Sequence, residues 1–295
     1  MHDLIKENAT KKGLITPTPI QDQSIPHGLN GSDIVGIANT GTGKTIAFAM
    51  PVLHKLITDP EARALIMAPT RELAQQIEDE CRIIGKGSGV HGALLIGGSP
   101  MGVQLRDLRA NPRIVIGTPG RIKDHIERGT LPIAKFNVIV LDEVDRMLDM
   151  GFIEDMCDIL EKASPVRQSF FYSATMDNKV ADLIKAFTAE AITVSVKTGE
   201  TGENIHQDIG PYQTTGQKIQ QLHDLLDSDA VVKALVFDET QRSVERLNDE
   251  LLSRGFKADA IHGGKSQGQR TRALGKFKKN QVNILVATDV AARGI

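Results

Sequence analysis

The sequence predicts an α/β fold with two parallel-sheet domains in tandem, the second of which stops after a βαβαβ unit. The first reason is a series of short apolar runs that are continuous rather than alternating, as in parallel strands buried on both faces. In the first domain these runs span residues 34–38, 64–68, 93–96, 114–116, 138–141, 170–172 and 192–196. The second reason is that segments with helical spacing separate several of the runs, which is typical of alternating strands and helices.

Length and composition limit the class of protein. With 295 residues, 40% of them hydrophobic, the chain can bury a core, and two domains are favoured over the alternative of one. The formal net charge of -2 shows none of the excess positive charge that nonspecific nucleic-acid-binding proteins carry. Any nucleic-acid contact must therefore be confined to part of the surface. Cys81 and Cys157 lie outside any paired spacing, which favours reduced thiols over a disulfide or a zinc site. The sequence shows neither a signal peptide nor a membrane span, so we expect a cytoplasmic protein.

Helices of the first domain are expected at residues 45–57, 72–84, 153–162 and 180–187. Pro51 lies inside the first of them, where proline costs about 3 kcal/mol in a regular helix, so we expect a kink there.

A polar segment containing glycines, residues 197–203, predicts a linker and places the domains at 1–202 and 203–295. Beyond it the pattern restarts, with strands expected at 234–237, 258–261 and 283–287 and helices at 241–254 and 269–278.

Polar segments come directly after the apolar runs. They span residues 39–45, 69–73, 97–98, 118–121, 142–145, 173–175, 238–240, 262–264 and 288–294. Ligands of open parallel sheets bind in the crevice beyond the carboxyl ends of the strands, so these segments are predicted to form one site.

The segment 38–45 follows a strand and opens a helix, as a phosphate-binding loop does. It consists of Ala38, Asn39, Thr40, Gly41, Thr42, Gly43, Lys44 and Thr45. Its glycines let backbone N–H groups point at phosphate oxygens, Lys44 supplies a positive charge, and Thr45 offers a hydroxyl to Mg²⁺. The strict pattern has glycine where Ala38 stands, and the alternative is a plain glycine turn.

The acidic segment 142–145 ends the most apolar strand. One carboxylate, such as Asp142, suffices for Mg²⁺, which keeps most of its waters, and Glu143 could act as general base toward an attacking water. Standing alone the segment could be a solvated acidic turn, but the phosphate loop makes that alternative much weaker.

Other polar segments are less specific. Arg71 and Arg121 each follow a strand beside a hydroxyl residue and exposed backbone N–H groups, which suits phosphate binding, although ordinary turns with surface arginines explain them equally well. Residues 173–175 alone favour helix capping, and residues 97–98 form either a close-approach site or a plain turn. His262 is expected to be a turn residue rather than a metal ligand.

Taken together and in this order, the segments resemble the DEAD-box family of RNA helicases, within superfamily 2, along essentially the whole chain. Residues 13–21 resemble the family's Q motif, in which the glutamine, here Gln21, reads adenine, and this implies ATP as the nucleotide. Residues 262–270 and 286–294 are similar to the bacterial RhlE-like subgroup. The resemblance implies two RecA-like domains and an RNA-dependent ATPase that unwinds or remodels RNA with little base preference.

The resemblance also implies roles for individual residues. Lys44 and Thr45 would bind phosphate and Mg²⁺, Asp142 would bind Mg²⁺, and Glu143 would activate water. Asp145, Ser173 and Thr175 would couple hydrolysis to domain closure. The RNA backbone would be held by Pro69, Thr70, Arg71, Gly98, Thr118, Gly120 and Arg121, and by Thr240 and Thr288 of the second domain, where Asp289 would face the nucleotide. The implied partners are RNA, through backbone contacts, and ribosomal or mRNA-decay assemblies, with the protein a monomer.

The sequence departs from the family pattern at three places. Val144 stands where the family has alanine, which leaves the acidic positions intact. The family's aromatic residue upstream of the Q motif would fall near Leu4, which puts adenine stacking in doubt. The sequence ends within the motif 288–294, before the family's arginine finger, which is worth roughly 10³ to 10⁵ in turnover, so we expect very little hydrolysis by this chain.

Two alternatives follow from these features. A non-catalytic, ATP-dependent RNA-binding clamp would fit a chain that ends there, although the retention of Lys44 and Glu143 argues against it. A DNA translocase of the same superfamily is disfavoured by the Q motif.

Overall fold

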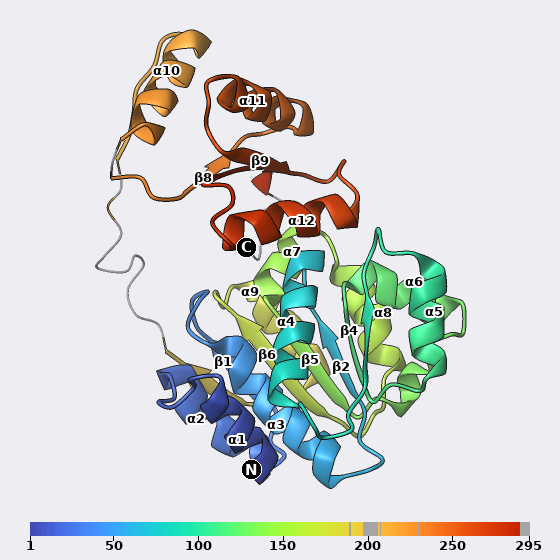
Figure 1. Ribbon diagram of the computed structural model, residues 1–295. Helices are drawn as coiled ribbons and strands as arrows, with labels where there is room; N and C mark the ends of the chain where they lie inside the picture. Colours follow the sequence, from blue (N-terminus) through green and yellow to red (C-terminus); the bar gives the residue numbers. More distant parts are fainter. Residues whose placement is uncertain (189, 197–205, 207, 229, 290–295) are drawn as a thin grey trace. The chain divides into compact units, whose positions relative to one another are not determined.

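A computed structural model describes residues 1–188, 190–196, 206, 208–228 and 230–289, which form two compact units, Met1–Gly199 and Glu200–Ile295 (Figure 1). The predicted linker at 197–203 lies outside the described residues. The domain limits of 1–202 and 203–295 stay a prediction.

The first unit is built on a seven-stranded sheet in which every pairing is parallel. Its strands are β1 Ile34–Ile37, β2 Ala64–Met67, β3 Gly92–Leu95, β4 Ile114–Gly117, β5 Val138–Asp142, β6 Gln168–Ser173 and β7 Ile192–Ser195. They lie in the order β3-β4-β2-β5-β6-β1-β7. The apolar runs therefore all form strands, which confirms the predicted parallel sheet.

The helices of the first unit include several that the sequence analysis missed. They are α1 Asp3–Lys11, α2 Pro19–Leu29, α3 Lys44–Thr58, α4 Arg71–Ile84, α5 Met101–Arg109, α6 Pro119–Glu127, the 3₁₀ turn η1 Ile133–Lys135, α7 Val144–Asp149, α8 Ile153–Lys162 and α9 Asn178–Phe187. The expected helices correspond to α3, α4, α8 and α9. Helix α3 runs through Pro51 without a break, and the proline ring packs on α2, where a Cβ added at Gly28 would lie 3.0 Å from Pro51 Cγ.

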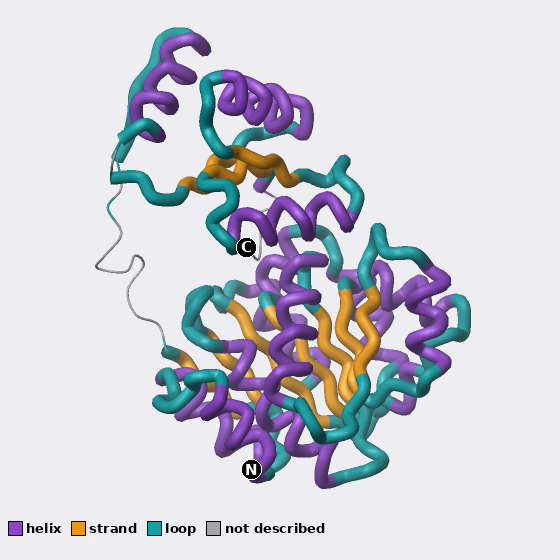
Figure 2. The backbone as a smooth tube through the Cα atoms, viewed as in Figure 1, coloured by secondary structure: helices purple, strands orange, loops and turns teal. Residues whose placement is uncertain are grey.

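Helices cover both faces of this sheet (Figure 2). Successive strand residues alternate between two apolar clusters, as strand geometry requires: Ile34 and Ile66 belong to one, Val35 and Leu65 to the other. The first cluster includes residues of α2, α3 and α4, and the second includes residues of α7, α8 and α9. Because both faces are buried, polar groups can gather only at the ends of the strands.

The second unit has the predicted βαβαβ core. Its strands are β8 Ala234–Phe237, β9 Ala258–Ile261 and β10 Ile284–Ala287, paired in parallel in the order β8-β10-β9. Its helices are α10 Thr215–Leu226, which was not predicted, α11 Gln241–Ser253 and α12 Gln267–Lys278. Among the described residues, none of the helices has the length and apolar character that a membrane span requires.

Candidate functional site

The predicted site residues of the first unit lie at one edge of its sheet, which we call the loop edge, because the carboxyl ends of parallel strands point the same way. The strand order divides them into two groups. The phosphate-loop half comprises residues 38–45, 142–145 and 173–175, which follow β1, β5 and β6. The arginine half comprises residues 69–71, 97–99 and 118–121, which follow β2, β3 and β4.

The phosphate loop is shaped by glycine. Gly41 and Gly43 have φ angles of 82° and 93°, in the left-handed region where a side chain would strain the backbone. Lys44 begins α3 and is buried, and its Nζ donates a hydrogen bond of 2.8 Å to the carbonyl of Ala38. Thr42 Oγ1 donates to the carbonyl of Asn39 at 2.8 Å. The loop therefore curls around the N-terminus of α3, where anions bind well.

Ala38 is fully buried, and its N–H donates to the carbonyl of Ser173 at 3.0 Å. It belongs to the apolar cluster under the loop, so alanine is accommodated where the strict pattern has glycine. Thr40 and Gly41 are exposed at the tip of the loop, and Thr45 is half-buried in the first turn of α3.

Gln21 lies against the phosphate loop. Its Oε1 accepts a hydrogen bond of 3.1 Å from the N–H of Thr18, which caps α2, and its Nε2 donates to the carbonyl of Gly43 at 3.1 Å. A Cβ added at Gly43 would lie 2.3 Å from Gln21 Nε2. The side-chain amide thus joins the start of α2 to the loop.

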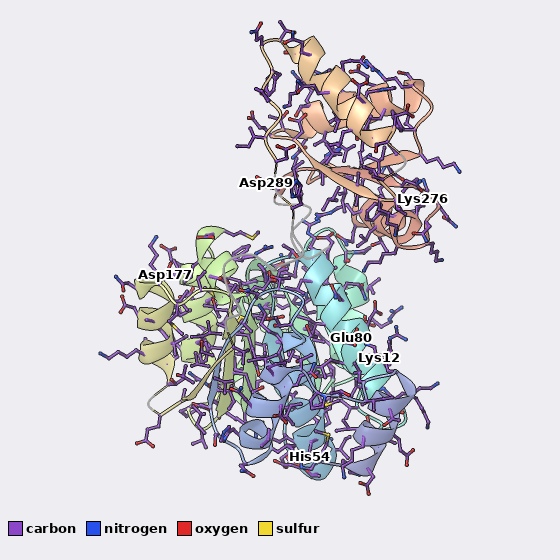
Figure 3. All side chains as sticks on the ribbon, turned by 90° about the vertical axis from the view of Figure 1, so that its left-hand side faces the viewer. Lys12, His54, Glu80, Asp177, Lys276 and Asp289 are labelled. Carbon is purple, nitrogen blue, oxygen red and sulfur yellow. The ribbon has the colours of Figure 1, made fainter. Side chains whose placement is uncertain are left out.

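Leu4 lies at the far ends of α3 and α4 from the loop edge. Leu4 lies close to Gly87, which follows α4: a Cβ added at Gly87 would be 3.5 Å from Leu4 Cδ1. Nearby, the N–H of His2 donates a hydrogen bond of 3.2 Å to Nδ1 of His54, near the end of α3. Figure 3 shows His54 far from the loop edge, and farther along α1 Lys12 pairs with Glu80 of α4. Since a helix of 15 residues is about 22 Å long, Leu4 cannot contact a nucleotide in the phosphate loop.

The acidic segment combines burial with an unusual backbone. Asp142 ends β5 with 2% exposure, and burial raises the pKa of its carboxyl group to about 7 although the charge of Lys44 acts in the opposite direction. Glu143 adopts φ 56° and ψ 55°, a left-handed conformation that costs of order 1–3 kcal/mol in a residue other than glycine. Its Oε2 lies 3.6 Å from Arg146 Nε. Val144 is fully buried in the second apolar cluster, which accommodates the larger side chain.

Asp145 connects the acidic segment to the turn after β6. Its Oδ2 accepts hydrogen bonds from the N–H of Ala174 at 3.2 Å and from the N–H and hydroxyl of Thr175 at 3.0 and 3.1 Å. The Ala174 contact was not foreseen, because a backbone donor leaves no signal in the sequence. Within the described part of the chain, the Ser173 hydroxyl is buried and makes no hydrogen bond.

The arginine half is arranged around a glycine turn. A Cβ added at Gly97 would be 3.0 Å from Arg71 Nη2, so a larger residue would have to displace the guanidinium group, and Gly98 has a φ of 79°. Arg121 Nη1 donates to the carbonyl of Ser99 at 3.4 Å. The two arginines thus approach the same turn.

The remaining residues of the arginine half lie at the starts of α4 and α6. Thr70 caps α4, its Oγ1 accepting from Leu73 N–H at 3.2 Å, and Pro69 beside it is buried. Thr118 caps α6 without a side-chain capping bond, and Gly120 is exposed.

The predicted residues of the second unit also follow its strands. Thr240 caps α11, its Oγ1 accepting from Ser243 N–H at 3.0 Å, Thr288 is buried after β10, and Asp289 is exposed (Figure 3). Residues 290–294 of the predicted motif lie outside the described residues. His262 is a turn residue: its Nδ1 accepts from Gly264 N–H at 3.2 Å, so its Nε2 carries the hydrogen and donates to Glu245 Oε1 at 2.8 Å.

The phosphate-loop half suits a cation that keeps most of its water. Among the described residues, no group of three or more His, Cys, Asp or Glu side chains could hold a metal ion. Asp142 Oδ1 is buried and has no hydrogen-bond partner within the described residues, and the Thr45 hydroxyl lies on the first turn of α3. One carboxylate, one hydroxyl, phosphate oxygens and waters form a coordination shell that Mg²⁺ accepts.

Comparison with known proteins adds independent evidence. The family model described as "DEAD/DEAH box helicase" matches residues 18–184, and the one described as "Helicase conserved C-terminal domain" matches 217–295. The chain is 42% identical over 297 residues to the DEAD-box ATP-dependent RNA helicase CshA of Bacillus cereus; the match covers 100% of this chain and 56% of the relative. The chain therefore spans little more than half of that relative's length.

Two solved structures are also similar, each over 100% of this chain. A DEAD box protein from the hyperthermophile Methanococcus jannaschii is 37% identical, with 80% of its chain covered and a TM-score of 0.65. S. cerevisiae Dbp5 bound to RNA and ADP BeF3 is 25% identical, with 76% of its chain covered and a TM-score of 0.86. Such structures are consistent with a tandem RecA-like fold.

Proposed function

Because the chain belongs to the DEAD/DEAH box helicase family, we propose that it forms the motor core of an ATP-dependent RNA helicase, which locally unwinds or remodels RNA. The observation that carries the proposal is the joint placement of the phosphate-loop half and the arginine half at one edge of one sheet. A nucleotide and an RNA backbone can then act on the same rigid β2–β5 pair at the centre of the sheet.

ATP would be held by the phosphate loop, with Gln21 beside it. The backbone N–H groups of the loop and Lys44 bind the phosphates, for which Lys44 exchanges its hydrogen bond to Ala38. Thr45 and Asp142 would hold Mg²⁺, which when bound neutralises charge on the phosphates. Glu143 would accept a proton from the attacking water.

Coupling between hydrolysis and RNA would use Asp145. Its carboxylate joins the end of β5 to the turn 173–175 after β6 by hydrogen bonds. A shift of the backbone at Glu143 during hydrolysis would therefore be passed to that turn by Asp145. Ser173 and Thr175 lie in this turn, as the family resemblance implies for residues that link hydrolysis to domain closure.

The RNA backbone would be held by the arginine half and, in the second unit, by Thr240 and Thr288, with Asp289 facing the nucleotide. Arginines and backbone N–H groups bind phosphates without reading bases, so the protein acts with little sequence preference. Dbp5, one of the similar structures, is bound to RNA and ADP BeF3, which supports RNA and a nucleotide as ligands here.

Finer assignments rest on the sequence. The tract 262–270 supports the RhlE-like subgroup, and two free cysteines support a reducing, cytoplasmic setting. Ribosomal or mRNA-decay assemblies are the proposed protein partners of a monomer.

The proposal is tested by ATP hydrolysis with and without RNA, in the full-length protein and in its Glu143→Gln variant, because very little hydrolysis is expected from residues 1–295 alone. We expect RNA to stimulate hydrolysis and Glu143→Gln to abolish it while ATP still binds. Unchanged hydrolysis in the variant would exclude the role of Glu143. ATP-dependent RNA binding without turnover in the full-length protein would favour the clamp, and stimulation by DNA rather than RNA would favour a translocase.

A further inference from the structure

A buried glutamine holds both ends of the glycine turn in the arginine half. Gln104 of α5 is 1% exposed, and its Nε2 donates hydrogen bonds of 3.1 Å to the carbonyls of Ile96 and Ser99. These carbonyls stand immediately before and after Gly97 and Gly98. Glycine loses more conformational entropy on ordering than any other residue, so hydrogen bonds at both ends of this turn are needed to keep it in one conformation.

His125 of α6, fully buried, holds this glutamine in turn. Its Nε2 lies 3.3 Å from Gln104 Oε1, and its Nδ1 lies 2.8 Å from Thr130 Oγ1. Since both amide hydrogens of Gln104 are used by carbonyls, its Oε1 must accept, and His125 Nε2 must carry the hydrogen. His125 Nδ1 lies within hydrogen-bond distance of Thr130 Oγ1, and the Thr130 hydroxyl donates to the backbone carbonyl of His125 at 3.0 Å.

The surroundings of His125 favour the neutral form of its imidazole. Burial is the main cause that lowers the pKa of His125, and the positive charge of Arg121 adds to it. A neutral ring that carries its hydrogen on Nε2 can still donate to Gln104 Oε1.

The same elements place the two arginines. The guanidinium group of Arg71 lies against Gly97, inside the clamped turn, and Arg121 donates to the same Ser99 carbonyl that Gln104 holds. Arg121 and His125 lie four residues apart on α6, on one face of the helix. The hydrogen-bond network of Thr130, His125 and Gln104 therefore connects α6 and α5 to the turn between the two arginines.

We propose that Gln104 and His125 are positioning residues for RNA: they fix the turn 97–99 so that Arg71 and Arg121 meet the RNA backbone at a set spacing. This inference rests on the proposed function of the arginine half. A pre-ordered turn binds more tightly because no ordering is left to occur on binding. If the network only stabilised the fold, its loss would weaken the protein without a selective effect on RNA.

The test compares variants by three measurements: affinity for a fluorescent single-stranded RNA in the presence of a non-hydrolysable ATP analogue, affinity for a fluorescent nucleotide, and thermal unfolding. Gln104→Met and His125→Leu remove the hydrogen bonds but keep the volume. His125→Gln keeps a donor at the position of Nε2. Ser24→Ala is the matched control, since Ser24 makes a buried hydrogen bond of 3.2 Å with Tyr172 away from the arginine half.

We expect Gln104→Met and His125→Leu each to weaken RNA binding about tenfold, the double variant to lose little more, and nucleotide affinity to stay unchanged. His125→Gln should restore most of the RNA affinity, and Ser24→Ala should lower stability alone. His125→Leu leaves Gln104 in place, so the RNA affinity of this variant tests the inference even if Gln104→Met fails to fold.

Wild-type RNA affinity in His125→Leu, or an equal loss in His125→Gln, would overturn the inference while leaving the proposed function intact. A wild-type protein that binds no RNA would instead refute the proposed function.

Discussion

The two halves of the loop edge differ in whether the buried polar groups in and beside them are hydrogen-bonded within the protein. In the phosphate-loop half, Asp142 Oδ1 and Ser173 Oγ are buried without hydrogen-bond partners among the described residues, and Glu143, whose Oε2 lies 3.6 Å from Arg146 Nε, has a strained backbone. Next to the arginine half, Gln104 of α5 and His125 of α6 use all their side-chain hydrogen-bonding groups within the protein. Unpaired buried groups are unstable by themselves and favour a polar ligand. From this difference we expect the phosphate-loop half to need a polar ligand for its buried groups, and the turn of the arginine half to be ordered before a ligand binds.

The largest expected effect is on the phosphate-loop half. Lys44→Ala should weaken ATP binding by about 3 kcal/mol, or roughly 100-fold, because a charged hydrogen-bond donor to phosphate is lost. RNA binding without nucleotide should stay unchanged. Lys55→Ala, at the other end of α3, is the control for a lost lysine, and both affinities are measured by fluorescence titration. A loss of nucleotide-free RNA binding in Lys44→Ala would show that the two halves do not act separately.

A smaller effect is expected in the arginine half. Arg121→Ala should weaken RNA binding about tenfold and lower the slope of log affinity against log salt concentration by about 1, since one phosphate contact is lost. ATP affinity should not change. Arg128→Ala at the C-cap of the same helix serves as the control, since Arg128, like Arg121, pairs with Asp124. An unchanged salt slope would argue against a phosphate contact by Arg121.

The strain at Glu143 predicts a gain in stability. Glu143→Gly should raise the free energy of unfolding by about 1 kcal/mol, because glycine tolerates the left-handed backbone, while it abolishes hydrolysis. Asn111 has a φ of 54°, so Asn111→Gly should give a smaller gain in the free energy of unfolding. Denaturant unfolding measures both. A lower free energy of unfolding in Glu143→Gly would contradict the claim that the backbone of Glu143 is strained at the expense of stability.

The smallest effect concerns the glycine turn. In Gly97→Ala the new methyl group must displace the end of the Arg71 side chain, so RNA affinity should fall by a factor of about 3, less than 1 kcal/mol. Gly102→Ala on α5 meets no atom within 4 Å and should leave RNA affinity unchanged. Equal RNA affinity in the two variants would show that Arg71 does not need its place beside Gly97.

Much of this fold could be predicted because its strands are buried on both faces. Runs such as 64–68 and 138–141 are apolar without interruption, and only a buried parallel strand suits them. Helix α5 was missed because Gln104 is its only buried residue, and α2 because prolines stand both at its start and at Pro26. In such segments tertiary packing decides the structure, and the apolar pattern is too weak to show it.

The site was predictable where a local motif carries it. The phosphate loop and the acidic segment follow strands, so their meeting at one edge follows from parallel topology. The clamp of Gln104 and His125 joins residues 21 apart in the sequence and forms only when α5 and α6 pack. The left-handed backbone of Glu143 was not predicted either, because glycine, asparagine and aspartate are the usual residues there. The roles assigned to the site residues stay predictions.

The central claim, that one sheet edge carries two separable ligand sites, is tested most directly by hydrogen–deuterium exchange with each ligand alone and with both. The account predicts that a non-hydrolysable ATP analogue with Mg²⁺ protects residues 38–45 and 142–145, and that single-stranded RNA protects residues 69–71, 97–99 and 118–121. Both ligands together should protect the turn 173–175 beyond either alone, through Asp145. Protection of the same residues by both ligands, or of neither set by its ligand, would contradict it.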